Sequence, residues 1–187
     1  RIPLAGWSKP IREPHETHAL AHDPAGAPPL DGAPLARYVI IAGFGVVGRA
    51  IADRFKVAHV PICVVDLNRQ TVDTQRRLGH RAVYGDISNP EVLEGVGVEQ
   101  ADAVILTIPD DEATMRACEA IRRLRPDVFI AARTSFLAKA MMAATLGADQ
   151  VIVEEVATAE TMARQVLDEI RRRARPPQSP AAPADGS

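Results

Sequence analysis

The chain has 187 residues, a length that suits one domain with a full hydrophobic core and some unstructured length rather than two complete domains. Its residues are 47% hydrophobic and its formal net charge is −2, so bulk charge does not favour a nucleic-acid partner. No stretch approaches the roughly 18 to 20 apolar residues needed to cross a bilayer, and no signal peptide is present, so we expect the chain as given to be soluble.

Residues 1–36 are rich in proline and show no sustained apolar period, which predicts a flexible linker. His15, His18 and His22 lie in this segment beside Glu16. A flexible segment offers no fixed geometry for metal ligands, and Ala19 stands where an HExxH zinc motif needs its second histidine, so we expect no metal site. Because the chain starts with arginine rather than methionine, we expect it to be a piece of a longer protein or a processed product.

From residue 37 onward, short β-branched runs alternate with helical periods, which predicts an α/β fold with a parallel sheet. Continuous apolar runs such as 103–106 suit strands that helices cover on both faces, so we expect a Rossmann-like domain of three layers. Its span is 37–170, followed by a disordered tail over 171–187. Cys63 and Cys118 fall in apolar patterns and are expected to be buried, reduced thiols. The expected strands are 38–42, 61–66, 81–84, 103–107, 128–132 and 150–153, and the expected helices lie near 46–57, 69–79, 90–95, 110–125, 135–147 and 156–170.

A glycine-rich loop joins the first strand to a helix with an apolar face. Gly43 permits a tight turn, Gly45 lets the backbone approach a pyrophosphate, and Gly48 lets the helix pack closely on the strand. Asp66 ends the second strand, 18 residues past Gly48, where its carboxylate can accept hydrogen bonds from both ribose hydroxyls. That carboxylate would repel a 2′-phosphate, so NAD(H), AMP, ADP or ATP is favoured over NADP(H).

Further candidate residues follow the later strands. The pair Gly85 and Asp86 follows the third strand, Thr107 and Ile108 follow the fourth, and Arg133 follows the fifth. Ligands of such folds bind at this carboxyl edge of the sheet. The alternative is that these residues serve turns and helix caps.

Five motifs in order, the glycine loop, VVDLN, YGD, LTIPDD and AART, make residues 37–167 resemble the N-terminal lobe of RCK domains, also called KTN or TrkA-N. RCK domains regulate potassium channels and potassium or proton-coupled cation antiporters. The resemblance implies that the glycine loop lines the phosphates, that Asp66 holds the ribose, and that Asp86 and Ile87 lie near the adenine. It also implies that Thr107 and Ile108 close the cleft floor, while Arg133 reaches phosphates or a second ligand near a subunit interface. The candidate binding residues are Gly43, Phe44, Gly45, Val46, Val47, Gly48, Asp66, Leu67, Arg69, Gly85, Asp86, Ile87, Thr107, Ile108 and Arg133.

Within that family the chain looks most like the soluble C-terminal domain of Kef-like antiporters, because it has no separate C-terminal ligand-binding lobe. Ser135 stands where many Kef domains carry a second arginine, so the resemblance leaves open whether glutathione or another effector binds. The implied partner is a membrane transport domain, either in the same polypeptide ahead of Arg1 or in a separate one. A channel, an antiporter and a separate cytosolic subunit remain open, as do the transported ion and the sign of regulation.

The last expected helix, 156–170, carries an apolar stripe formed by Ala159, Met162, Ala163, Val166, Leu167 and Ile170. The stripe either packs on its own domain or, as the resemblance suggests, crosses to a second copy in a homodimer. We therefore expect a non-enzymatic nucleotide sensor at the cytoplasmic face of the membrane. The alternative is an NAD-dependent oxidoreductase, but only about 130 residues look structured and no Tyr-x-x-x-Lys pattern is present, which disfavours it.

Overall fold

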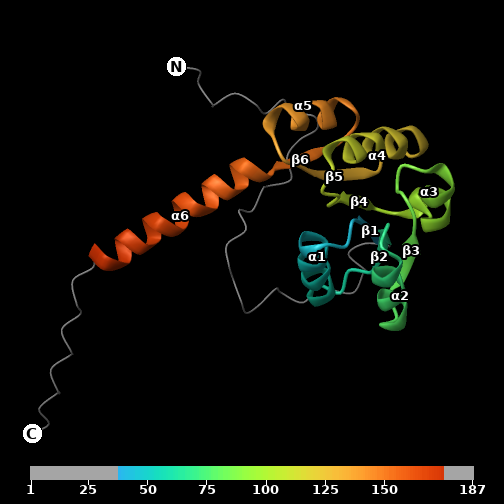
Figure 1. Ribbon diagram of the computed structural model, residues 1–187, viewed down its shortest axis with the longest axis horizontal. Coiled ribbons are helices and arrows are strands. Elements are labelled where there is room, and N and C mark those ends of the chain that lie inside the picture. Colours follow the sequence, from blue (N-terminus) through green and yellow to red (C-terminus); the bar gives the residue numbers. More distant parts are fainter. Residues whose placement is uncertain (1–37, 175–187) are drawn as a thin grey trace, which may run out of the picture. The chain divides into compact units, whose positions relative to one another are not determined.

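The computed structural model describes residues 38–174, which hold six strands and six α-helices (Figure 1). The expected linker, its histidines and residues 175–187 lie outside the described residues. The strands are β1 (Val39–Ala42), β2 (Ile62–Asp66), β3 (Arg81–Tyr84), β4 (Ala103–Leu106), β5 (Phe129–Thr134) and β6 (Gln150–Val153). The helices are α1 (Val46–Val57), α2 (Arg69–Arg77), α3 (Pro90–Val96), α4 (Asp111–Leu124), α5 (Leu137–Thr145) and α6 (Glu154–Ala174), with a short 3₁₀ helix, η1 (Val98–Gln100).

All neighbouring strands pair in parallel, in the order β3-β2-β1-β4-β5-β6. This is the order of a doubly wound Rossmann sheet, in which successive strands are added to one side from β1 to β3 and to the other side from β4 to β6. The expected α/β fold with a parallel sheet of about six strands and a C-terminal helix is therefore confirmed. Each expected strand and helix is present within residues 38–174, with ends shifted by up to four residues.

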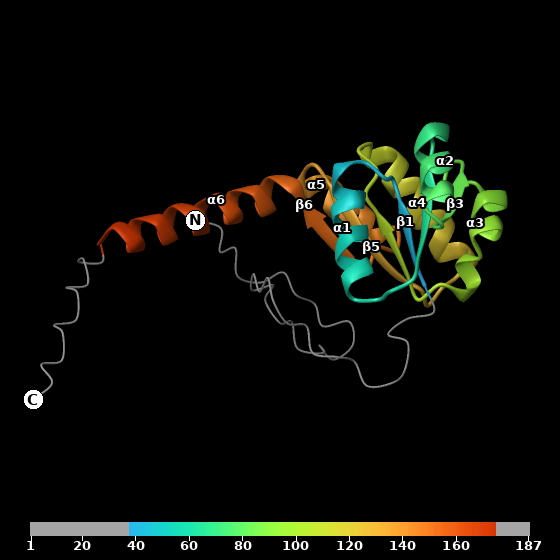
Figure 2. The same cartoon turned by 90° about the horizontal axis from the view of Figure 1, so that it is seen from below.

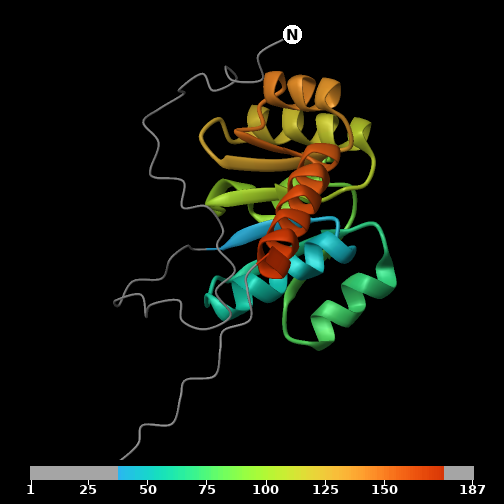
Figure 3. The same cartoon turned by 90° about the vertical axis from the view of Figure 1, so that its left-hand side faces the viewer.

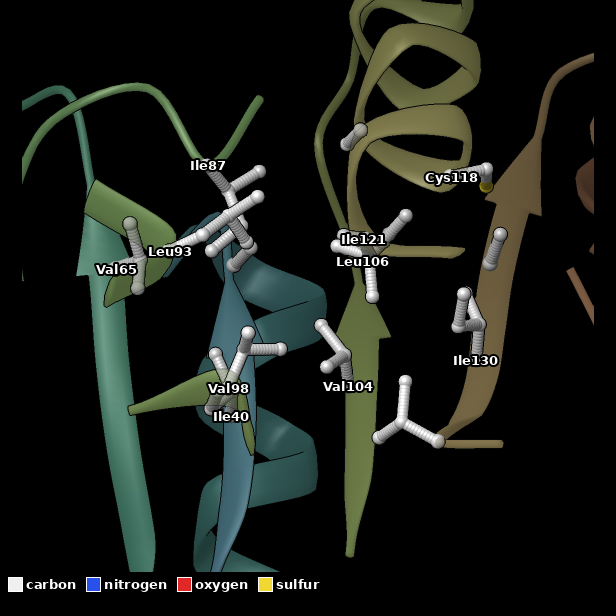
Figure 4. Packing of buried hydrophobic residues seen from close by; sticks show 14 of the residues in the cluster. Ile40, Val65, Ile87, Leu93, Val98, Val104, Leu106, Cys118, Ile121 and Ile130 are labelled. Atoms are coloured by element: carbon white, nitrogen blue, oxygen red, sulfur yellow. The ribbon is translucent and has the colours of Figure 1, made fainter. Parts of the chain in front are cut away.

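Helices cover both faces of the sheet, which gives the three layers. Successive residues of β1 point to opposite faces, so that Ile40 joins the larger core cluster and Ile41 the smaller one. The helices α1 and α2 lie on one face, and α4 and α5 lie side by side on the other (Figures 1 and 3). Figure 4 shows the larger cluster, in which Val65 of β2 lies near Ile87 and Leu93, and Leu106 of β4 lies near Ile121 of α4.

The strand β5 ends two residues later than expected, which changes the position of Arg133. The ladder between β5 and β6 pairs Ala131 with Gln150 and continues to Thr134 and Val153. Arg133 therefore lies within the strand, opposite Ile152, rather than in a loop after the strand. Its side chain is held by a rigid element at the sheet's carboxyl edge.

The last helix, α6, continues to Ala174 and so includes residues 171–174, which we expected to belong to the tail. Arg171, Arg172 and Arg173 form ion pairs three or four residues back with Asp168 and Glu169. Such pairs, and basic residues in a last turn, favour helix.

None of the residues of α6 is buried, and its apolar stripe is exposed: Met162, Val166, Leu167 and Ile170 each expose half or more of their surface. The helix leaves the sheet directly after β6 (Figures 1 and 2). Residues 38–174 therefore leave the stripe uncovered. No helix within residues 38–174 is both long enough and apolar enough to cross a membrane.

Candidate functional site

A cavity of about 890 Å³ opens at the carboxyl ends of the strands, beside the neighbouring strands β1 and β4, whose following helices lie on opposite faces of the sheet. Open α/β sheets bind their ligands at this position. The residues that line it come from the glycine loop and from the loops after β2, β3 and β4, with Arg133 from β5. They are Ala42, Gly43, Gly45, Val46, Val47, Val65, Asp66, Leu67, Asn68, Arg69, Gly85, Asp86, Ile87, Thr107, Ile108, Pro109, Ala113 and Arg133.

The three glycines of the loop differ in whether, and why, the fold requires glycine at their positions. Gly43 has φ +87°, a backbone conformation that residues with a side chain rarely adopt. A Cβ on Gly48 would lie 2.2 Å from the carbonyl oxygen of Gly43, so close packing of α1 on the loop requires glycine there. A Cβ on Gly45, in contrast, would meet no described atom within 4 Å.

The fold therefore does not require a glycine at position 45. Gly45 lines the cavity and is the N-cap of α1, with no side-chain cap bond. The first N–H groups of a helix have no intrahelical partner and carry a partial positive charge. A bare backbone at this place leaves room for an anionic group to contact them.

Asp66 faces the same cavity and also holds the glycine loop. Its Oδ2 accepts a hydrogen bond of 2.6 Å from the backbone N–H of Phe44, and its Oδ1 accepts one of 2.7 Å from that of Asn68. Because a carboxylate has about four acceptor positions, these two bonds leave capacity for further donors. The Asp66 side chain is thus fixed in orientation and can still accept hydrogen bonds from hydroxyl groups.

On the β3 side of the cavity, Arg69 and Asp86 are both positioned by neighbours. The Arg69 guanidinium lies over the ring of Tyr84, 4.7 Å from its centroid. Asp86 accepts hydrogen bonds from the backbone N–H and the hydroxyl of Ser88, at 2.9 and 2.8 Å. The turn role considered for Asp86 is therefore present, although the residue also lines the cavity. The next residue, Ile87, also lines the cavity and is buried.

Thr107 ties the glycine loop to β4. Its buried hydroxyl donates to the carbonyl oxygens of Ala42, at 3.2 Å, and of Gly43. The backbone N–H of Thr107 also donates to Ala42, at 2.8 Å. These contacts set the floor of the cavity.

Arg133 lines the cavity from β5 and forms an ion pair with Glu154, the first residue of α6. Its side chain is 20% exposed. The Nε of Arg133 is buried without a hydrogen-bond partner in the described part of the chain. A buried donor without an acceptor is costly, so this nitrogen marks a place where an oxygen would be stabilising.

The structure brings together every candidate binding residue except Phe44 and Gly48. Phe44 turns its side chain into the smaller core cluster, because a large apolar ring gains more there than in an open cavity, and Gly48 is buried in α1. Residues of the lining that are outside the candidate set are Asn68, Pro109 and Ala113 and the strand residues Ala42 and Val65. Asn68 had a signal in the sequence, since it caps α2 by accepting a hydrogen bond from the N–H of Thr71.

The sequence profile of the TrkA-N domain matches residues 39–154. The putative cation/proton antiporter YbaL of Escherichia coli (strain K12) is 30% identical over 128 residues, which are 68% of this chain and 23% of YbaL. The chain thus spans less than a quarter of the length of this curated relative.

Solved structures share the fold. The TrkA-N domain of the Escherichia coli inner membrane protein ybaL has a TM-score of 0.68 at 28% identity, covering 72% of this chain and 99% of that one. A structure of GsuK bound to ADP has a TM-score of 0.62 at 25% identity, covering 71% and 34%. The Kef CTD of Shewanella denitrificans in AMP-bound form has a TM-score of 0.63, covering 71% and 81%, and at 21% identity it supports the fold alone.

Proposed function

The chain belongs to the TrkA-N domain family, and from this premise we propose that it is a regulatory domain that binds an adenine nucleotide in the cavity beside the glycine loop. The observation that carries the proposal is Gly45, which borders the cavity at the start of α1 and has open space where a side chain would be. A nucleotide phosphate is the group that such a helix start accommodates.

The other lining residues fit the remaining parts of a nucleotide. The Asp66 carboxylate would accept hydrogen bonds from the two ribose hydroxyls, and its charge disfavours a 2′-phosphate. The loop with Asp86 and Ile87 would hold the adenine, and Arg133 would contact the phosphates. NAD(H), AMP, ADP and ATP all meet these requirements. That GsuK was solved with ADP supports this class of ligand.

The partner that we propose is a membrane transport domain, in the same polypeptide or in a separate one, with this domain at the cytoplasmic face. The supporting relatives are the putative cation/proton antiporter YbaL and the GsuK channel. Two copies of the chain would associate through α6, whose apolar stripe is exposed. The nucleotide would control transport by binding one dimer geometry more tightly than another, and the difference between the two affinities would limit the size of the effect.

Isothermal titration calorimetry tests the binding proposal. We expect AMP, ADP or NAD(H) to bind and NADP(H) to bind much more weakly. Asp66→Ala should weaken binding by about 1 to 3 kcal/mol, the scale of hydrogen bonds to a charged acceptor. Asp73→Ala removes an exposed acid of α2 and serves as the control, with no effect on affinity. Equal affinity of wild type and Asp66→Ala would show that the cavity is not used in this way.

An NAD-dependent oxidoreductase shares the fold and is the alternative. The polar side chains of the described lining are aspartate, asparagine, threonine and arginine, and a histidine, tyrosine or lysine that could deliver a proton is not among them. We expect no turnover when the chain is incubated with NADH and a panel of carbonyl compounds. Turnover that disappears in a Gly45→Ala, Asp66→Ala double variant would establish the enzyme instead.

A further inference from the structure

Arg133 belongs both to the cavity and to the base of α6. It lies on β5 opposite Ile152 of β6, and its guanidinium pairs with Glu154 where α6 begins. The helix follows β6 without an intervening loop (Figure 1). A change in the partner of Arg133 would therefore act directly on the first turn of α6.

The hydrogen-bonding capacity of Arg133 is not filled by Glu154. A guanidinium has five N–H donors, and the buried Nε of Arg133 has no partner in the described residues. A phosphate, like a carboxylate, can accept two parallel hydrogen bonds from one arginine guanidinium. A phosphate in the cavity would thus compete well for this side chain.

The attachment of α6 depends on few contacts. None of its residues is buried, so the hydrophobic effect does little to hold it against its own domain. The Glu154 side chain is itself 43% exposed, which allows it to leave Arg133 and be hydrated. Loss of this ion pair would therefore change how the start of α6 is held.

We propose that Glu154 and the phosphates of a bound nucleotide compete for Arg133, so that nucleotide binding releases the base of α6. This inference rests on the proposed nucleotide function. It identifies the side chain that couples the cavity to α6. Because coupling is reciprocal, removing the Glu154 charge must strengthen binding of a phosphate-bearing ligand.

Calorimetric titration of the full chain with ADP and with adenosine tests the competition. Glu154→Gln should bind ADP roughly threefold to tenfold more tightly than wild type, while its affinity for adenosine, which has no phosphate, stays unchanged. Glu155→Gln removes the neighbouring charge in the same helical turn and should leave both affinities unchanged. In an Arg133→Gln background, Glu154→Gln should have no effect on ADP binding.

Hydrogen exchange gives an independent test at the helix. ADP should raise exchange in the first turns of α6 in wild type. In Glu154→Gln these turns should exchange faster even without ligand, and ADP should add nothing further. Slower exchange of these turns on ADP binding would overturn the proposal.

The two proposals fail in different ways. If wild type binds neither ADP nor adenosine, the nucleotide function fails and the competition with it. If wild type binds ADP but Glu154→Gln binds it with the same affinity, only the competition is wrong. Tighter ADP binding in both Glu154→Gln and Glu155→Gln would indicate a general charge effect, which also overturns it.

Discussion

Packing of the fold requires glycine at position 48 but not at position 45, where we assign the glycine to ligand binding. A Cβ on Gly48 would press on a backbone oxygen at 2.2 Å, so Gly48→Ala should lower the free energy of unfolding by about 3 kcal/mol through overpacking. Gly45→Ala has open space and should cost at most about 1 kcal/mol, the scale of a changed N-cap. Urea unfolding followed by circular dichroism measures both. The reverse order of the two costs would contradict the assignment of these glycines.

The two cysteines are both fully buried, and burial raises the pKa of each thiol, that of Cys118 to about 11. Because the thiolate is the reactive form and exists only as the pH approaches the pKa, both thiols should resist Ellman's reagent at pH 8. Two thiols per chain should react once urea unfolds the protein, which is the control. Rapid reaction of either thiol in the native protein would show that the element that carries it, β2 for Cys63 or α4 for Cys118, opens easily.

At the level of single residues, the sequence allowed prediction of those parts of the site that depend on spacing along one βα unit. The glycine loop and Asp66 follow strand ends at fixed distances, and the structure places both at the cavity. Phe44 could not be placed, because its neighbours in space decide which way its side chain turns. Ala113 lines the cavity from the first turn of α4, which depends on how α4 packs against the sheet.

The helix α6 presents one exposed apolar face, and we expect this face to form the contact between two copies. Val166→Glu should then shift the chain from dimer to monomer, because it places a charge in the buried contact. Arg164→Gln changes the net charge by the same amount on the opposite face and should leave the dimer intact. Sedimentation velocity distinguishes the two species.

A dimer that persists in Val166→Glu would place the contact elsewhere. A chain that is monomeric already in wild type would mean that the stripe meets a different partner.

At the level of elements, the type and order of the helices and strands could be predicted, and the ends were less certain. Pairing with β6 extends β5 to Thr134, and this pairing is not visible in the sequence of β5 alone. Ion pairs between Arg171 or Arg173 and the preceding acids carry α6 past residue 170. Both differences arise from interactions that local propensity does not include.

For the whole molecule, the alternation of apolar runs with helical periods was enough to predict a parallel sheet in three layers. Continuous apolar strands require cover on both faces, and a parallel strand requires a crossover connection. What lies against α6 could not be predicted, because a stripe of this kind fits its own domain or a second copy equally well. Nothing in the described part of the chain covers the stripe.

The Gly45 backbone and the start of α1 border the cavity, which lies at the carboxyl ends of the central strands β1 and β4. We propose that a nucleotide occupies this cavity. The most direct test of nucleotide binding there is calorimetric titration of ADP into wild type and into Gly45→Ala, with folding of the variant verified by its unfolding curve. We predict that wild type binds one ADP per chain and that the added methyl group weakens binding at least about tenfold, since it occupies the space of the phosphate. Equal binding of ADP by wild type and a folded Gly45→Ala variant would contradict the proposal.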